Sequence, residues 1–172
     1  MIWNASIVLC NWIDQHIDTK NTNVLELGAG CGLPGIHCAL NGANETFLTD
    51  LEEELHYPTS LTAEFNIKIK PLKWGRDNSV IFKNECGHLF DLVLASDCVS
   101  TDVYGRSSWH FLCDTVDELL SPNGRLLVCS VRRPNDGLEE FLQLLKETLA
   151  HIELVSTDGD VEIHECRRFK LL

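Results

Sequence analysis

The chain has 172 residues, 44% of them hydrophobic and 23% charged, which is enough for one domain with a full core. Its 26 acidic and 14 basic residues give a formal net charge of -12, which argues against broad nucleic-acid binding. The charge favours a basic partner or a cationic substrate, with an effect on solubility alone as the alternative. No apolar run approaches the roughly 20 residues of a membrane span, and no signal peptide is visible, so no membrane partner is expected.

Eight cysteines are scattered along the chain without a CxxC pair, so zinc-site spacing is absent and no metal is expected. Several of them lie in apolar runs, which is typical of small core residues. Scattered cysteines without a secretory signal favour a reducing compartment, so we expect the cytoplasm, with the nucleus as a second location.

Strands alternate with helices along most of the chain. Apolar residues recur with helical spacing from Trp3 to about Ile17, within an N-terminal helical segment of residues 1–20. The later predicted elements are strand 24–28, helix 32–40, strand 46–50, a mostly helical segment 51–66, strand 71–74, polar loop 75–89, strand 90–96, helix 109–120, turn 121–124, strand 126–131, helix 135–150, and strands 152–155 and 161–171.

This alternation predicts an α/β, Rossmann-like, doubly wound fold. Its sheet would have seven strands, mostly parallel, and would end in a C-terminal antiparallel hairpin because no helix separates the last two strands. We expect a single domain over residues 1–172, since the sequence contains no repeat, low-complexity tract or linker.

The sequence VLELGAGCGLPGI at residues 24–36 predicts a buried strand, a glycine turn and the start of a helix. The glycines of this stretch are Gly28, Gly30, Gly32 and Gly35. Glycine adopts positive φ easily and lets a ligand approach the backbone, while the helix N-terminus adds free N–H groups. The stretch therefore predicts a nucleotide-type cofactor site, with a tight turn that binds no ligand as the alternative.

The residues around the glycines limit the kind of cofactor. Leu33 stands where the dinucleotide motif G-x-G-x-x-G requires its third glycine. No lysine occurs between Lys20 and Lys68, so the phosphate-loop motif is absent. With Glu26 near the end of the strand, the turn favours a ligand with a positive group over a pyrophosphate.

Candidate site residues follow the later strands, because ligands of open α/β sheets bind at the carboxyl ends of strands. Asp50 ends one strand, where an acid binds ribose hydroxyls; a helix N-cap is its alternative role. Trp74 is suited to flank an adenine ring, with a core position as the alternative. Ala95 and Asp97 lie where the reacting group would be, although Asp97 would also serve as a helix cap or loop hydrogen-bonding residue.

The order Trp3, ELGAGCGLPG, TD, WG and ASD, followed by a hairpin, resembles the class I (seven-β-strand) S-adenosylmethionine-dependent methyltransferases. More narrowly, it is similar to the protein-lysine methyltransferase-like family. The resemblance covers nearly the whole chain, and the spacing of ELGAGxGLPG to TDLEE and LKWG makes it specific. It implies S-adenosyl-L-methionine as the cofactor and an N-methyltransferase that modifies a protein lysine side chain.

The resemblance also implies roles for individual residues. The positions that match cofactor-binding residues are Trp3, Glu26, Gly28, Gly30, Gly32, Asp50, Trp74 and Ala95. Glu26 and the glycines match the loop that holds the methionine part, Asp50 the ribose-binding acid, and Trp74 the tryptophan beside the adenine. Trp3 matches an N-terminal tryptophan that flanks the cofactor, and Ala95 belongs to the segment next to the transferred methyl group.

The chain departs from the family pattern in two places. Family members commonly carry Asp-x-x-Tyr/Phe after the strand over 90–96, whereas this chain has Asp97-Cys98-Val99-Ser100. Tyr104 is not expected to replace the missing aromatic residue. Relatives also usually have a β-rich segment before the tryptophan that matches Trp3. Both departures concern substrate recognition more than cofactor binding.

The implied reaction requires the target lysine to lose a proton before it attacks the methyl group. With a reference pKa near 10.4, this costs roughly 4–5 kcal/mol at pH 7, and burial of the lysine lowers the cost. A carboxylate favours the ammonium form instead. Asp97, the candidate catalytic residue, is therefore expected to position the substrate amine and not to deprotonate it.

Other functions are compatible with the same residues. A methyltransferase for protein histidine or arginine, or for a small-molecule amine, is one alternative. A catalytically impaired S-adenosylmethionine-binding partner protein is another, because the aromatic residue is missing at Ser100. Leu33 disfavours a nicotinamide-dependent oxidoreductase. We expect a monomer that acts on a basic protein substrate.

Overall fold

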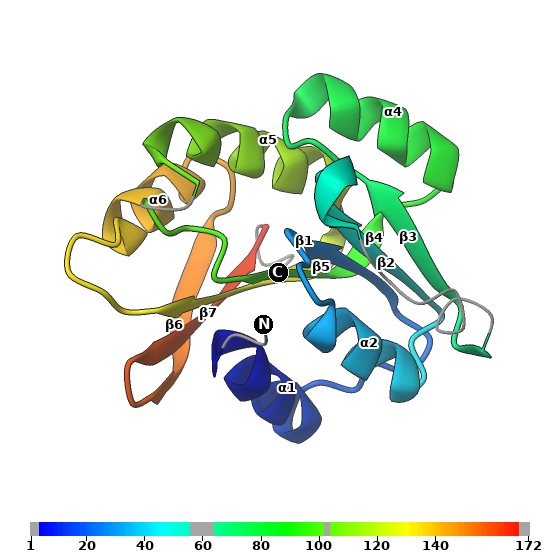
Figure 1. Cartoon of the computed structure of the whole chain (residues 1–172), viewed down its shortest axis with the longest axis horizontal. Helices are drawn as coiled ribbons and strands as arrows, with labels where there is room; N and C mark the ends of the chain where they lie inside the picture. The colour runs from blue at the N-terminus through cyan, green and yellow to red at the C-terminus, as the bar shows by residue number, and fades with distance from the viewer. Residues whose placement is uncertain (1–3, 56–63, 102–103, 169–172) are drawn as a thin grey trace.

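The computed structural model describes residues 4–55, 64–101 and 104–168. Within these residues, seven strands form one sheet in the order β3-β2-β1-β4-β5-β7-β6 (Figure 1). The strands are β1 (Asn23–Leu27), β2 (Glu45–Asp50), β3 (Ile67–Pro71), β4 (Phe90–Ser96), β5 (Leu120–Val131), β6 (His151–Asp158) and β7 (Val161–Arg167). The strands from β3 to β5 in this order are parallel, and β7 is antiparallel to β5 and β6, which confirms the predicted sheet.

Helices cover both faces of the sheet. They are α1 (Asn4–His16), α2 (Leu33–Leu40), α4 (Arg76–Cys86), α5 (Trp109–Leu119) and α6 (Leu138–Leu145), with the 3-10 turns η1 (Glu52–Glu54) and η2 (Arg106–Ser108). Figure 1 shows α4, α5 and α6 on one face and α1 and α2 on the other. The central strands are therefore buried on both sides, which explains the nearly continuous apolar sequence FDLVLAS of β4.

Side chains alternate between the two halves of the core. On one face, Leu9 and Ile13 of α1 pack in a cluster with Leu94 of β4. On the other face, the cluster contains residues of α5, α6 and β4, among them Trp109, Leu112, Phe141 and Val93. Because the period of a strand is two, the residues that end β4 point alternately toward these two halves.

Two predictions between residues 67 and 89 were wrong. The third strand is Ile67–Pro71, not 71–74, and the expected loop over 75–89 contains α4. The sequence IKIKP of β3 places lysines on a strand at the edge of the sheet, where the Lys68 ammonium lies 5.2 Å from the centroid of the Phe47 ring. The α4 helix buries only Ser79 and Phe82, so its apolar pattern is weak.

Several predicted boundaries also move. The segment expected to be mostly helical over 51–66 contains η1, and residues 56–63 lie outside the described part. The predicted turn over 121–124 lies within β5, where Leu120 pairs with Phe90 and Arg125 with Leu92, so the strand bulges between them. The helix expected over 135–150 is shorter and begins after Gly137.

Candidate active site

The candidate site lies at the carboxyl ends of β1 and β4, where the order of the strands reverses. β1 pairs with β2 on one side and with β4 on the other, so the loops that follow β1 and β4 diverge to opposite faces and leave a crevice. The two loops are in contact, because the Cys98 thiol donates a hydrogen bond to the carbonyl of Leu27 at 3.1 Å. The glycine turn and the Asp97 segment therefore meet as predicted.

The glycine turn follows β1 with three residues in the left-handed region. The φ angles are 59° at Gly28, 52° at Gly30 and 71° at Gly32. A Cβ atom on Gly28 would lie 3.0 Å from the Cys98 sulfur, whereas a Cβ on Gly30 would have no heavy atom within 4 Å. The backbone at Gly28 is thus closely packed, and the backbone at Gly30 faces open space that a ligand can enter.

Glu26 is buried at the base of the turn, with 1% of its surface exposed. Its Oε2 accepts a hydrogen bond from the Gly35 N–H at 2.7 Å, which links β1 to the first turns of α2. Burial raises the pKa of Glu26 to about 8, and the nearby Asp50 adds to this, while the Gly35 N–H opposes it. A cation bound beside Glu26 would favour its ionised form.

Asp50 ends β2 and connects it to the glycine turn. Its Oδ2 accepts the Gly30 N–H at 2.9 Å, and its Oδ1 accepts the Leu51 N–H at 2.8 Å. The next candidate, Trp74, contacts the same turn, because its Cζ2 would lie 3.3 Å from a Cβ on Gly28. Residues that follow three different strands therefore converge on the turn.

Two cavities adjoin this turn. The glycine-loop cavity, of about 270 Å³, is lined by Ser6, Glu26, Gly28, Ala29, Gly30, Cys31, Ser96, Asp97, Ser100, Tyr104 and Arg133. The aromatic cavity, of about 300 Å³, is lined by Asp50, Leu51, Leu72, Lys73, Trp74, Tyr104, Ser108 and Phe111. Tyr104 lines both, with its ring 5.3 Å from that of Trp74 between centroids, so it stands between the two cavities.

Asp97 lies in the glycine-loop cavity as half of an ion pair. Arg133 donates from Nη1 to Oδ1 at 3.0 Å and from Nη2 to Oδ2 at 2.7 Å. The Val131 N–H also donates to Oδ1, at 3.3 Å. Asp97 has a φ of 57° and its own N–H donates to the Cys129 carbonyl at 2.7 Å, so the backbone after β4 is fixed to the end of β5.

The structure places most of the predicted site residues around the two cavities. Glu26, Gly28, Gly30 and Asp97 line the first, and Asp50 and Trp74 line the second. Gly32 caps the start of α2. Trp3 lies outside the described residues. Ala95 lines neither cavity among the described residues; its side chain is 1% exposed and packs in the core, and Ser96, which points the other way, lines the cavity instead.

The sequence interpretation missed other lining residues. In the glycine-loop cavity, Ser6 and Arg133 were given no role, whereas Ser96 and Ser100 belong to the segment after β4 that was expected near the substrate. Arg133 lies two residues after the end of β5. Site residues were sought directly after the earlier strands, and the same criterion applied to β5 would have identified Arg133. Tyr104 lines both cavities, and its N–H donates a hydrogen bond to the Ser100 carbonyl at 3.0 Å.

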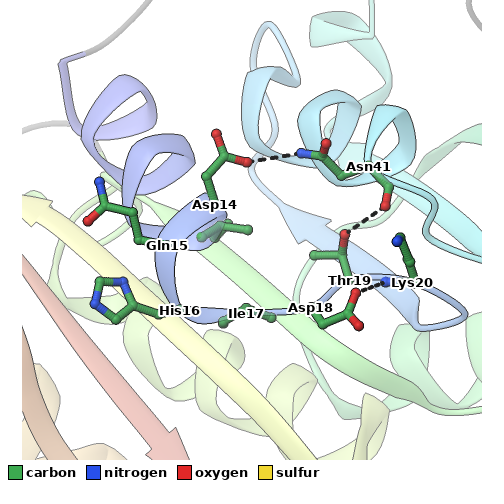
Figure 2. A pocket seen from close by; sticks show the side chains of 9 residues that line it. Asp14, Gln15, His16, Ile17, Asp18, Thr19, Lys20 and Asn41 are labelled. Carbon is green, nitrogen blue, oxygen red and sulfur yellow. Dashed lines mark hydrogen bonds between the residues drawn. The ribbon is translucent and has the colours of Figure 1, made fainter.

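A third and larger cavity, of about 380 Å³, lies away from the glycine turn, at the end of α1 (Figure 2). It is lined by residues 13–20 and Asn41, close to the amino end of β1. Figure 2 shows the Asp14 carboxylate directed at the Asn41 amide, at 3.1 Å, and Asp14 also contacts His37 at 2.7 Å. The Asp14, Asn41 and His37 side chains are therefore hydrogen-bonded to one another at this cavity.

In residues 4–55, 64–101 and 104–168, no three His, Cys, Asp or Glu side chains are grouped so that they could hold a metal ion. No helix among these residues has the length and apolar character needed to cross a membrane.

The residues around the glycine turn fit S-adenosylmethionine. The open space at Gly30 admits a ligand to the backbone, and the acids Glu26, Asp50 and Asp97 suit a ligand that carries positive groups. The aromatic cavity offers Trp74 and Phe111 to a flat ring. The single cation that lines the glycine-loop cavity in the described residues, Arg133, is already paired with Asp97.

Comparison with known proteins agrees with this fit. The family model described as lysine methyltransferase matches residues 1–148. The chain is 30% identical over 170 residues to EEF1A lysine methyltransferase 3 of Mus musculus, across 95% of this chain and 68% of that protein. It is 31% identical over 179 residues to protein N-lysine methyltransferase METTL21A of Danio rerio, across 99% of this chain and 77% of that protein.

The fold is also similar to that of solved structures. The T. thermophilus 16S rRNA N2 G1207 methyltransferase RsmC, solved in complex with AdoMet and guanosine, matches with a TM-score of 0.69 and 17% sequence identity. The match covers 98% of this chain and 44% of that one. At this identity the likeness supports the methyltransferase fold alone.

Proposed function

The chain belongs to the lysine methyltransferase family, and from that membership we infer that it is an S-adenosylmethionine-dependent N-methyltransferase that modifies protein lysine side chains. The observation that carries this proposal is the extent of the family match. Residues 1–148 include every described residue that lines the two cavities, so the match covers the whole candidate site.

S-adenosylmethionine, when bound, supplies a methyl group already activated by its positive sulfonium, so catalysis consists mainly of alignment. Glu26 and the turn from Gly28 to Gly32 would hold the methionine part at the glycine-loop cavity. Asp50 would bind the ribose, and Trp74 would flank the adenine in the aromatic cavity. This assignment is supported by the contact between Asp50 and the turn and by the position of Trp74 beside Gly28.

The target lysine would enter the glycine-loop cavity beside Asp97. Bound S-adenosylmethionine would supply the methyl group to the neutral amine and would be left as S-adenosylhomocysteine, while the cavity would hold the amine in line with that group. The proton of the original ammonium must pass to solvent before this step. Asp97 would position the amine through its carboxylate, which is largely buried at the end of β4.

Methyl labelling of a cell extract tests the proposal. The purified chain is incubated with extract and radioactive S-adenosylmethionine, and labelled proteins are analysed by mass spectrometry. We expect methyl groups on lysine, strong loss of labelling for Asp97→Ala, and S-adenosylmethionine binding by that variant in calorimetry. Loss of both activity and binding would instead place Asp97 in the cofactor site.

The same experiment separates the alternatives. Methyl groups on histidine or arginine, or on a small-molecule amine, would replace the lysine assignment. Cofactor binding without labelling of any extract protein would indicate a catalytically impaired partner protein, the alternative suggested by Ser100 in place of an aromatic residue. Absence of binding to both S-adenosylmethionine and S-adenosylhomocysteine would contradict the proposal itself.

We also propose the setting in which the enzyme acts. The net charge of -12 supports a basic protein substrate and disfavours nucleic acid or an anionic membrane as the partner. Eight free cysteines support the cytoplasm, with the nucleus as a second location. Light scattering should give the mass of a monomer, and fractionation of cells that express the tagged chain should recover it in these compartments.

A further inference from the structure

Both oxygens of the Asp97 carboxylate accept hydrogen bonds from Arg133, and one of them also accepts a backbone N–H. Oδ1 accepts hydrogen bonds from Arg133 Nη1 and the Val131 N–H, and Oδ2 accepts one from Nη2 at 2.7 Å. The Asp97 side chain is 8% exposed and that of Arg133 is 33% exposed. Asp97 is thus the more buried partner of the pair, and both side chains line the glycine-loop cavity.

This arrangement matters because the two charges act oppositely on an amine. A carboxylate beside an amine favours the ammonium form, whereas a neighbouring cation disfavours it. If Asp97 were unpaired, a lysine that entered the cavity would be held in the charged form, which cannot attack a methyl group. The guanidinium cancels most of that effect while leaving the carboxylate in place as an acceptor.

Resting on the proposed function, we propose that Arg133 is a positioning residue that acts through Asp97: it neutralises the carboxylate so that the target lysine loses its proton on entering the glycine-loop cavity. The same cation disfavours an arginine substrate, because a guanidinium stays charged at all physiological pH values. Arg133 thus favours lysine, whose amine can lose a proton, over arginine as the substrate side chain.

The groups around Arg133 keep it charged. Asp97 has the largest effect in raising the pKa of Arg133, and Asp136 and Asp160 act in the same direction. Asp136 follows β5 and accepts the backbone N–H of Arg133 at 3.0 Å, and Asp160 lies between β6 and β7. Acidic groups after β5 and in the turn between β6 and β7 therefore both favour the charged form of the Arg133 guanidinium.

Burial disfavours the charged forms of three other titratable groups at the cavity. Burial raises the pKa of Glu26 of β1 to about 8, and it raises the pKa of Cys98 and Tyr104, after β4, above their ordinary values. The Cys31 thiol belongs to the glycine turn, and Asp50 lies beyond it in the aromatic cavity. Asp97 and Arg133 form the ion pair that lines the glycine-loop cavity beside these groups.

The pH dependence of methyl transfer tests this role. The probe is the recombinant form of the extract protein that the unaltered chain labels, and the readout is the single-turnover rate between pH 6 and 10 with saturating S-adenosylmethionine. For Arg133→Gln we expect the apparent pKa of the rate profile to rise by about one unit, so that the rate falls about tenfold at pH 7 and recovers above pH 9.

Three further variants separate this effect from loss of structure. Arg133→Lys keeps the cation and should retain a profile near that of the unaltered chain. Asp97→Asn combined with Arg133→Gln removes both charges and should return the apparent pKa toward the original value. Arg132→Gln is the matched control, because Arg132 pairs with Asp136, Glu139 and Glu162 and lies outside the lining of the cavity among the described residues.

The outcomes are distinguishable. A profile for Arg133→Gln that superimposes on the original, or a rate reduced equally at every pH, would overturn the role of Arg133. Absence of lysine methylation by the unaltered chain at every pH would instead contradict the proposed function. A rise in the apparent pKa for Arg132→Gln equal to that for Arg133→Gln would show that the effect is not specific to the cavity, and would also overturn the inference.

Discussion

Glu26 is a carboxyl group that the fold buries between the glycine turn and α2. Its pKa of about 8 lies above its ordinary value of 4.5, chiefly because burial disfavours the charged form. The folded chain therefore keeps a proton that the unfolded chain releases. The free energy of unfolding should fall as the pH rises from about 4.5 to 8, by up to roughly 1.4 kcal/mol per pH unit from this group.

The variant Glu26→Gln tests this stability contribution. Glutamine has a similar shape and keeps an oxygen for the Gly35 N–H, but it has no proton to lose. Urea unfolding should give similar stabilities for the two proteins near pH 5, and the variant should be the more stable by about 2–4 kcal/mol near pH 9. Stability curves that run parallel across this range would contradict the buried, protonated state of Glu26.

Asp50 offers a second prediction at the residue scale. Its two oxygens accept the N–H groups of Gly30 and Leu51, and asparagine can replace only one of these acceptors. Asp50→Asn should weaken S-adenosylmethionine binding by roughly 10- to 100-fold, the effect of one hydrogen bond to a charged group. Calorimetry measures the affinity, and unchanged affinity would remove Asp50 from the cofactor site.

Asp91→Asn is the matched control for this prediction. Asp91 also accepts a backbone N–H, that of Asn23 at 3.0 Å, but it lies at the amino end of β1. Because Asp91 belongs to the first residues of β4, at the opposite ends of the strands from the two cavities, its replacement should leave the affinity for S-adenosylmethionine unchanged. Thermal unfolding of both variants would show whether either loses its fold.

The residues of the site could be predicted where a short sequence pattern fixes the backbone. Glu26 and Asp50 lie in or at the ends of strands that the apolar pattern defines, and their neighbours in sequence determine where they point. Arg133 and Tyr104 are different, because their positions depend on contacts with Asp97 and Trp74 that are 36 and 30 residues away in sequence. No local pattern contains such contacts.

At the scale of elements, the start of α4 is joined to α5 by buried hydrogen bonds. The Thr115 hydroxyl of α5 accepts the Gly75 N–H at 2.8 Å and donates to the Phe111 carbonyl at 2.9 Å. The Ser79 hydroxyl lies 2.8 Å from the Gly75 carbonyl. Because Gly75 follows Trp74, this junction also fixes one wall of the aromatic cavity.

Replacing Thr115 with valine tests the junction. Valine has nearly the same shape, so the buried Gly75 N–H would lose its acceptor at a cost of roughly 1–3 kcal/mol in the free energy of unfolding. Urea unfolding measures this cost, and calorimetry should show weaker S-adenosylmethionine binding as Trp74 loosens. Thr115→Ser keeps the hydroxyl; if it were as destabilised as Thr115→Val, the hydrogen bond would not be the cause.

The same region shows why element prediction failed between residues 67 and 89. Strand β3 alternates isoleucine and lysine because it lies at the edge of the sheet, where lysines reach solvent and neighbouring acids such as Glu45 and Glu85. The α4 helix places only Phe82 and Ser79 in the core, and Arg76 and Lys83 form ion pairs with Glu118 of α5, so its apolar pattern is too weak to predict a helix. Gly87, the C-terminal cap of α4 with a φ of 78°, was the one residue in this segment whose type indicates the end of a helix.

At the scale of the whole molecule, the mostly parallel seven-stranded sheet with its C-terminal hairpin could be predicted, because fully buried parallel strands have long apolar sequences and no helix separates the last two strands. The β4 strand was predicted with its observed bounds, since helices cover both of its faces. The site was expected at the carboxyl ends of the strands, and the observed strand order, which was not predicted, reverses between β1 and β4 and leaves the crevice there. The division of that crevice by Tyr104 could not be predicted, because it depends on how the loop after β4 folds back on the glycine turn.

The charge of the whole chain leads to the last prediction. With a net charge of -12, the enzyme should attract a basic substrate over distances that salt shortens, since the Debye length is about 10 Å at 0.1 M ionic strength. Raising the ionic strength from about 0.05 to 0.3 M should lower kcat/KM for the labelled protein several-fold, with little change in kcat. An unchanged kcat/KM would contradict a basic partner.

Position as well as total charge should matter for this attraction. Glu52, Glu53 and Glu54 are exposed directly after β2, at the carboxyl ends of the strands, where the two cavities lie. Glu147 is exposed beyond the far end of α6. Glu53→Lys and Glu147→Lys change the net charge equally, so a larger fall in kcat/KM for Glu53→Lys would show that the substrate approaches over the cavities. Equal falls would mean that only the overall charge attracts it.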